Sequence, residues 1–395
     1  MGSDLMRSEH AKDGVPPQMV SAAMRKRGFL PEQDPLTAFP ADSEFAVLDA
    51  IGRDLPSLLH DRGFRQYART FSIPLWPEER TGAEDLPQLR LYYVRVGFLA
   101  SAYINQVGQE PATVLPANLA GPLVRACKLL MRPAILSYDG YALYNWKRFR
   151  KDEPIALGNI DTIQNFVHLY DEHWFILVHV EIEAIAARIL DAIAKVQAAF
   201  RSGESAVVDE ALWAIASALT DLIKVLRRIP EKMDPALYYK TFRPYIRFFE
   251  NVFYEGGEQR GAADSAQAAP APVHMNFRGE TGAQSSIMPT LVAFMKIPHA
   301  PSMLTNHLAD MRNYMPPEHR QLIETVEAMP SIRELAGKHA FNAVLDAMAV
   351  FRTVHYGWAQ EYINRWTDDP RGTGGTPYMQ WLLQLIEETR AFKIA

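Results

Sequence analysis

The chain has 395 residues, of which 48% are hydrophobic and 22% charged, a composition typical of a globular protein with a sizeable core. Its formal net charge of −5 is small for this length, so no strongly basic surface predicts binding to nucleic acid or to an anionic membrane. Cys127 is the single cysteine, which excludes an internal disulfide and any Cys-x-x-Cys site. We therefore expect small molecules as partners and a reducing compartment.

No segment of the sequence predicts export or insertion into a membrane. Residues 1–26 mix charged residues with Pro16 and Pro17 and contain no apolar run of signal-peptide length. Apolar stretches such as 174–180 end at charged residues well before the roughly 20 residues that cross a bilayer. The sequence thus predicts a cytoplasmic protein without membrane spans.

The first part of the chain predicts an arm followed by a small helical domain. Residues 1–35 are polar and interrupted by prolines, as expected of a loosely held N-terminal arm. Leucine, tyrosine and valine recur at helical spacing over 45–59 and 86–106, and a shorter helix is expected over 116–131. We assign this small domain to residues 36–135 and expect a connecting loop over 136–165.

The remaining residues, 166–395, predict a larger helical domain. Apolar stripes over 174–200 and 209–226 indicate two long helices that form an antiparallel hairpin. A glycine-, alanine- and proline-rich stretch predicts a mobile loop over 255–275, and later helices are expected near Ser285, Glu318 and Ser331, around His355 and over 378–392. Strand-like alternation is nowhere sustained, so we predict an all-α fold.

His355 is the leading candidate for chemistry. Apolar residues recur at three- and four-residue steps from Phe341 to Tyr362, which puts the His355 imidazole on the buried stripe of a helix. A neutral imidazole there can bind the metal of a flat, apolar cofactor, and Arg352, one turn earlier, can meet an acidic group on the cofactor's edge. A core histidine satisfied by a neighbour explains the same pattern and is the commoner case.

Three further segments carry residues that suit ligands. Tyr238, Tyr239 and Arg243 offer aromatic faces and a guanidinium suited to an aromatic amino acid, although core packing with a surface salt bridge explains the same residues and is the commoner case. The glycine-rich segment 372–376 can cradle an anion or act as a hinge. The segment 278–286 can line a site or simply cap a helix with a serine. Hydrolase and kinase signatures are absent from the sequence.

From about residue 86 to the C-terminus, these segments together resemble the indoleamine 2,3-dioxygenase family. The resemblance is carried, in the family's order, by the segments 281–286, 311–320, 352–355 and 372–376. It implies heme b (iron protoporphyrin IX) as cofactor, and O2 with L-tryptophan or another indole as substrates. It also implies N-formylkynurenine as product, the first step of the kynurenine pathway, and an electron donor that keeps the heme ferrous.

The resemblance implies a role for individual residues. His355 takes the place of the proximal ligand of the heme iron, Arg352 that of the residue meeting a propionate, and Thr281 and Gly282 that of a loop on the distal side. Arg243 matches the arginine that holds the substrate carboxylate. The full set of positions expected to bind substrate is Tyr138, Tyr141, Leu177, Tyr238, Tyr239, Arg243, Gly375 and Thr376. No residue is expected to act as a catalytic acid or base.

The sequence departs from the family pattern at several of these positions. Leu177 stands where animal members carry a distal serine, and Val292 replaces an aspartate. Tyr238 and Tyr239 stand where phenylalanine is common. Two other interpretations therefore stay open: a heme-dependent oxygenase acting on another indole, and a non-enzymatic heme-binding sensor. A purely structural helical protein would need no cofactor.

Overall fold

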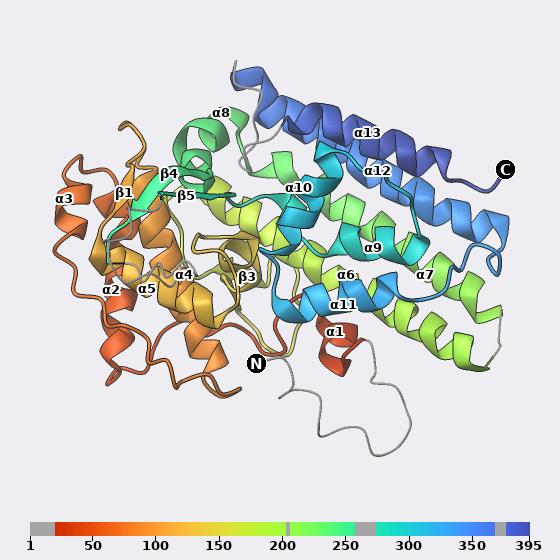
Figure 1. Cartoon of the computed structure of the whole chain (residues 1–395), viewed down its shortest axis with the longest axis horizontal. Coiled ribbons are helices and arrows are strands. Elements are labelled where there is room, and N and C mark those ends of the chain that lie inside the picture. The colour runs from red at the N-terminus through yellow and green to blue at the C-terminus, as the bar shows by residue number, and fades with distance from the viewer. Residues whose placement is uncertain (1–19, 203–205, 257–273, 368–376) are drawn as a thin grey trace, which may run out of the picture.

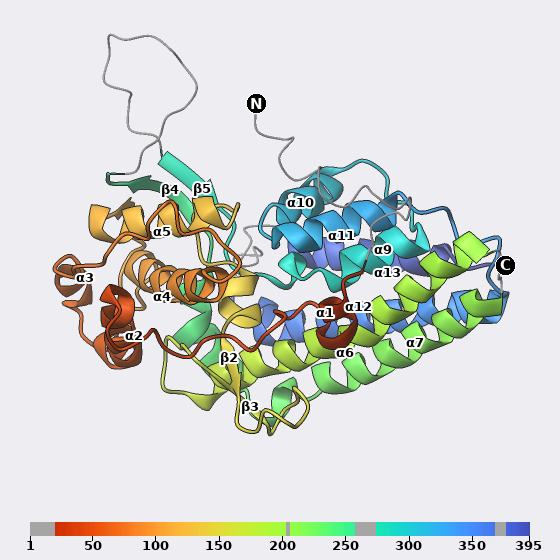
Figure 2. The same cartoon turned by 90° about the horizontal axis from the view of Figure 1, so that it is seen from below.

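The chain folds into helices with a few short strands in the computed structural model, which describes residues 20–202, 206–256, 274–367 and 377–395. Figures 1 and 2 show α2 to α5 gathered at one end of the molecule, and α6, α7 and α9 to α13 at the other. The predicted all-α fold class is confirmed. Among the residues described, no helix combines the length and apolar character needed to span a bilayer.

The first end of the molecule is organised around a helix that is buried over most of its length. Every residue of α4 (Leu86–Ile104) from Leu91 onward is buried, which explains why the helix is apolar on all sides. Its one strong charge in this stretch, Arg95, pairs with Asp49 at 2.9 Å. Around it lie η1 (Glu44–Ala46), α2 (Val47–Leu58), α3 (Phe64–Ala68) and α5 (Ala117–Leu129). The helices predicted over 45–59, 86–106 and 116–131 correspond to α2, α4 and α5.

The other end contains the predicted antiparallel hairpin, α6 (Tyr170–Ser202) and α7 (Ala206–Leu226). Helix α12 (Lys338–Tyr362) packs against α7, and α13 (Tyr378–Ala391) packs along α12 (Figure 1). Helices α9 (Ile287–Met295), α10 (Met303–Arg312) and α11 (Pro317–Glu327) complete this layer. Part of the expected N-terminal arm is ordered as α1 (Ala22–Arg27), which packs on α6 through Arg25 and Asp191.

Seven further short helical turns lie between the longer elements of the described chain. They are η2 (Asp139–Leu143), η3 (Ile229–Glu231), α8 (Pro235–Leu237), η4 (Tyr238–Phe242), η5 (Arg243–Ile246), η6 (Gly282–Gln284) and η7 (Asn364–Trp366). Two of them, η2 and η4, are π-helical, a geometry that often occurs at functional sites. Both carry residues that the sequence predicts to bind substrate.

The strands are the main difference from the sequence prediction. Strands β1 (Val114–Leu115), β4 (Phe249–Tyr254) and β5 (His274–Phe277) form one sheet, in which β1 is parallel and β5 antiparallel to β4. Strands β2 (Trp146–Arg148) and β3 (Ile160–Thr162) pair antiparallel within the segment 136–165 that we expected to be a loop. Strands of two to six residues are too short for alternation to be recognised in the sequence.

Several predictions fall on residues outside those described. These are the arm over 1–19, most of the loop over 255–275, and the glycine-rich segment 372–376 with Gly375 and Thr376. The proposed domain boundaries stay a prediction.

Candidate functional site

A cavity of about 690 Å³ lies in the larger end of the molecule, between α6, α9, α10, α12 and α13. Its lining is mostly apolar, with isolated polar groups that converge from different helices. The cavity contains four residues predicted from the sequence to bind the cofactor, Thr281, Gly282, Arg352 and His355. A large apolar cavity with a few converging polar groups is the usual form of a cofactor site.

His355 lies on α12 and reaches the cavity from the packed stripe of that helix. Phe341, Val344, Leu345 and Met348 on the same stripe are fully buried, as the helical spacing predicted. The imidazole itself is partly exposed, and it makes no hydrogen bond with any residue in the described ranges. Burial lowers the pKa of His355 to about 4, so the ring is neutral near pH 7. A neutral imidazole facing a cavity has a lone pair available for a metal.

Arg352 lies one helical turn before His355 on the same wall of the cavity. The residue is 6% exposed, and its Nη1 donates to the Leu385 carbonyl at 2.8 Å and to the Thr389 hydroxyl. Burial lowers its pKa to about 10, although Glu388 acts in the opposite direction. No carboxylate in the described part of the chain forms an ion pair with this guanidinium. A buried cation with only neutral partners is suited to an anionic group on a ligand.

The loop with Thr281 and Gly282 approaches the cavity in front of His355. A β-carbon placed on Gly282 would lie 3.9 Å from Nε2 of His355. Gly279, at the start of this loop, packs so tightly that a β-carbon there would lie 2.3 Å from the carbonyl oxygen of Ile246. Glycine at 279 therefore allows the loop to pack directly against the end of η5.

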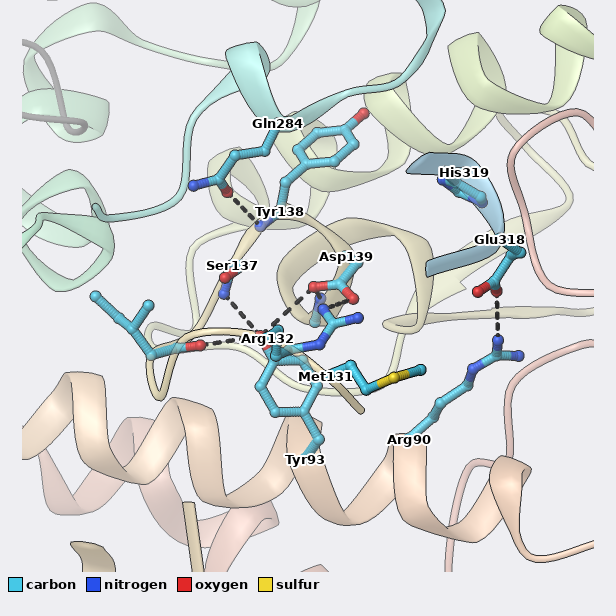
Figure 3. Close-up of polar contacts among 12 residues, drawn as sticks. Arg90, Tyr93, Met131, Arg132, Ser137, Tyr138, Asp139, Gln284, Glu318 and His319 are labelled. Carbon is cyan, nitrogen blue, oxygen red and sulfur yellow. Dashed lines mark hydrogen bonds and ion pairs between the residues drawn. The ribbon is translucent and has the colours of Figure 1, made fainter. Parts of the chain in front are cut away.

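Hydrogen bonds fix this loop to the segment that carries Tyr138 (Figure 3). The Gln284 Oε1 accepts from the Tyr138 amide at 2.9 Å, and the Gln284 Nε2 donates to the Gly279 carbonyl at 2.9 Å. Next to Tyr138, Asp139 forms a buried ion pair with Arg132. These contacts hold Tyr138 and the loop in one arrangement.

Tyr138 lines the cavity and is held by a buried carboxyl group of α6. Its hydroxyl donates to Glu183 Oε1 at 2.7 Å, and the Ser285 hydroxyl donates to the same oxygen at 2.6 Å. Burial raises the pKa of Glu183 to about 7, while the two hydroxyl groups lower it. Ser285 therefore binds Glu183, and the serine that precedes α9, Ser286, contacts His319 at 3.1 Å. Ser286, the N-cap residue of α9, makes no side-chain cap bond, whereas Ser285 also accepts from the Ile287 amide at 3.4 Å, at the start of the helix.

The structure differs from the sequence prediction at Leu177. Its side chain is buried in the core around α4 and does not line the cavity, whereas His179, two residues later on α6, does. Two residues along a helix rotate the side-chain direction by about 200°, so a two-residue offset exchanges a cavity position for a core position. The polar side chain that α6 contributes to this wall is therefore that of His179, which the sequence analysis did not single out.

The ring of His179 has a defined orientation. Its Nδ1 lies 2.7 Å from the carbonyl oxygen of Phe175, and its ring packs on Phe175 at 4.6 Å between centroids. Because a carbonyl accepts only, Nδ1 carries the proton and Nε2 keeps the lone pair. Burial lowers the pKa of His179, so the ring is neutral. The presence of a polar residue at 179, on the face shared with Ile182 and Glu183, was the signal available in the sequence.

Tyr238, Tyr239 and Arg243 form a second group next to the cavity. The Arg243 guanidinium lies 5.0 Å from the centroid of the Tyr239 ring, and both Arg243 and Tyr238 are buried. The helix turn between them, η4, is π-helical and ends directly at Arg243. The structure thus brings these three residues together, as the sequence predicted, but none of them lines the large cavity.

Phe175 connects this group to the cavity wall. Its ring lies 5.5 Å from that of Tyr238 and 6.2 Å from that of Tyr141, and it packs on His179. Tyr141, which does not line the cavity either, donates its hydroxyl to Glu172 at 3.2 Å. Val292, which stands where the family pattern has an aspartate, lines the cavity.

Most of the chain is similar in sequence to the members of one known protein family. The sequence model of a family described as indoleamine 2,3-dioxygenase matches residues 22–365. The chain is 31% identical over 360 residues to an indoleamine 2,3-dioxygenase of Saccharomyces cerevisiae, a match that covers 85% of this chain and 78% of the yeast protein. It is 26% identical to indoleamine 2,3-dioxygenase 1 of Rattus norvegicus, over 86% of this chain and 87% of the rat protein. It is also 25% identical to a 6-hydroxytryptophan 2,3-dioxygenase of Fusarium equiseti, over 85% of this chain and 82% of that protein.

Proposed function

Because the chain belongs to the indoleamine 2,3-dioxygenase family, we propose that it is a heme-dependent dioxygenase acting on the indole ring of L-tryptophan or a related indoleamine. The reaction inserts both atoms of O2 across the C2–C3 bond and gives N-formylkynurenine, the first step of the kynurenine pathway. The observation that carries this proposal is the neutral imidazole of His355 beside the buried guanidinium of Arg352 on one wall of an apolar cavity.

The residues of this cavity fit heme b. His355 offers a nitrogen lone pair for the iron, Arg352 a cation for a propionate, and the apolar walls suit the faces of the porphyrin. Heme held there supplies the redox chemistry that activates dioxygen. Thr281 and Gly282 line the same cavity, and we assign them to its distal side, as the family resemblance implies. The partners are O2 and an electron donor that keeps the iron ferrous, and the site of action is the cytoplasm.

The remaining predicted residues orient the substrate. Arg243 binds its carboxylate by paired hydrogen bonds, and Gly375 and Thr376 bind its amino-acid end, as the resemblance implies. Tyr138, Tyr141, Tyr238 and Tyr239 supply aromatic surface for the ring.

His179, and not Leu177, supplies the polar contact to the substrate from α6. Its Nε2 lone pair accepts a hydrogen bond from the ring N–H, which lies next to the reacting carbon C2. The chain's contribution to the rate is therefore mainly orientation, and no side chain has to act as an acid or base.

A visible spectrum of the heme-loaded protein with and without L-tryptophan, combined with turnover under 18O2, tests the function. We expect a tryptophan-dependent spectral change and a product that carries both labelled oxygen atoms. Arg243→Ala should retain heme and lose the spectral change. One labelled oxygen atom would favour another type of oxygenase. If the protein binds heme but does not turn over tryptophan, and Arg243→Ala shows the same spectral response as the wild-type protein, a heme-binding sensor would be favoured.

A further inference from the structure

Glu280 is a buried carboxyl group that the proposed reaction does not use. It is 3% exposed, and it forms no hydrogen bond or ion pair with any residue that the structure describes. Burial raises its pKa to about 8, and no nearby cation lowers it. Leaving such a group without a partner is costly, so its presence calls for an explanation.

The residues on either side of Glu280 in the chain place it between the Arg243 turn, the cavity wall and the Tyr138 segment. Gly279 packs against the end of η5, the turn that begins with Arg243. Thr281, on the other side, lines the cavity, but Glu280 itself is not part of that lining in the described chain. Gln284 ties the same loop to the Tyr138 amide. Glu280 therefore lies behind the cavity wall, between the Arg243 turn and the Tyr138 segment.

Three tyrosines assigned to the substrate ring lie within range of the Glu280 charge. Burial raises the pKa of Tyr138, Tyr141 and Tyr238, and the Glu280 carboxylate raises the pKa of each further. Their hydroxyl groups do not serve this carboxylate. The Tyr138 hydroxyl donates to Glu183 and the Tyr141 hydroxyl to Glu172. The carboxyl group of Glu280 thus receives no hydrogen bond from these tyrosines.

The geometry of indole determines which hydrogen can reach this carboxyl group. The C2–C3 bond has to face the cofactor cavity, and the ring nitrogen, bonded to C2, lies on the same side. Because the tyrosines are assigned to the ring, this orientation places the benzene edge on the side of Glu280. Plain indole has only carbon-bound hydrogens along that edge, whereas a hydroxyl substituent offers an O–H donor.

We propose that Glu280 is a specificity-determining residue that selects an indole amino acid with a hydroxyl group on its benzene ring, by accepting a hydrogen bond from that hydroxyl. The inference rests on the proposed function, since it uses the same site and the same orientation of the ring. The energetic reason is that a buried polar group left unpaired by the wrong substrate discriminates strongly against that substrate.

The test compares L-tryptophan with its 4-, 5-, 6- and 7-hydroxy derivatives. We measure kcat/KM with the heme-loaded protein and, independently, the dissociation constant of each compound by calorimetry. At least one hydroxylated compound should be preferred over tryptophan by about ten- to hundredfold, the range expected when a ligand satisfies a buried acceptor that is otherwise unpaired. Glu280→Leu should abolish the preference, while Glu280→Gln should retain part of it. Glu324→Gln, at an exposed position of α11, is the matched control.

A thermal unfolding measurement separates recognition from a structural role. Removing an unpaired buried carboxyl should leave the melting temperature of the ligand-free protein unchanged or raise it in Glu280→Leu, whereas a structural role would lower it. Equal binding of tryptophan and all four derivatives by the wild-type protein would overturn the inference. So would a preference that survives in Glu280→Leu. If no indole is turned over, the proposed function fails, and the calorimetric preference still decides the role of Glu280.

Discussion

Nε2 of His355 lies 3.9 Å from the position of a β-carbon on Gly282, and that β-carbon would meet no other heavy atom within 4 Å. A side chain at 282 would therefore grow into the space in front of the imidazole. We predict that Gly282→Leu folds normally but binds heme at least tenfold more weakly, because the leucine occupies room that the porphyrin needs. Gly282→Ala should show a smaller effect. Heme titration monitored by visible absorbance measures both, and unchanged affinity in Gly282→Leu would place the cofactor elsewhere.

Replacement of His355 tests the proposed iron ligand directly. His355→Ala should lose the axial spectrum of the wild-type protein and most of its heme content, because no other imidazole is assigned to bind the iron on that side. His339→Ala is a suitable control, since His339 is exposed on the same helix. Heme content per chain and the ferrous spectrum give the answer. The same axial spectrum in both variants would refute the assignment.

Arg352 should affect heme affinity and protein stability in opposite directions. Arg352→Leu removes the cation proposed for a propionate, and we expect heme binding to weaken by about ten- to hundredfold. The heme-free protein should lose little stability, because the leucine replaces a buried charge whose partners, Leu385 and Thr389, are neutral. Chemical unfolding of the heme-free variant measures this. Arg365→Leu, which removes an exposed pair with Glu361, is the control.

The long helices, and the closeness of Arg352 to His355, could be predicted from the sequence because both follow from local residue spacing. Regular apolar spacing over α6, α7 and α12 is visible along the chain, and Arg352 and His355 share a wall because they are one turn apart on the same helix. Helix α10, by contrast, was not anticipated, since only two of its residues, Leu304 and Met311, are buried. A helix with so few buried positions carries a weak periodic signal.

The sequence could not determine which residues meet across the fold. Leu177 and His179 differ by two positions on α6, and only packing against other elements decides which of them reaches the cavity. Glu280 looks like a surface residue in a polar loop, yet tertiary contacts bury it. Such placements depend on contacts between segments far apart in the sequence, which propensity and periodicity do not encode.

The orientation of His179 leads to a prediction about substrate recognition. If its Nε2 accepts the ring N–H, then the wild-type protein should bind L-tryptophan more tightly than the N1-methyl analogue by about five- to twentyfold, as for a neutral hydrogen bond. In His179→Phe, which preserves an aromatic ring, the two compounds should bind within about twofold of each other. Spectral titration of the heme-loaded proteins measures all four affinities. An unchanged ratio in His179→Phe would show that the N–H has another acceptor.

The buried carboxyl groups predict how stability depends on pH. Burial raises the pKa of Glu172 and Glu183 to about 7 and that of Glu280 to about 8. In the unfolded chain these groups ionise near their usual pKa of about 4.5, so between that value and the folded pKa the folded state holds more protons. Their contribution to stability is complete at low pH and is lost as the pH rises.

His319 acts in the opposite sense, because burial lowers its pKa to about 4 and its effect ends above its unfolded pKa of about 6.5. The net loss should therefore be clearest between about pH 6.5 and 8. Each carboxyl that ionises only on unfolding contributes about 1.4 kcal/mol per pH unit. Urea unfolding of the heme-free protein at pH 6.5, 7.2 and 8.0 should give a falling free energy of unfolding. Glu280→Gln should reduce the slope above pH 7, where Glu280 is the group still protonated, and a slope equal to that of the wild-type protein would mean that Glu280 is ionised in the folded state.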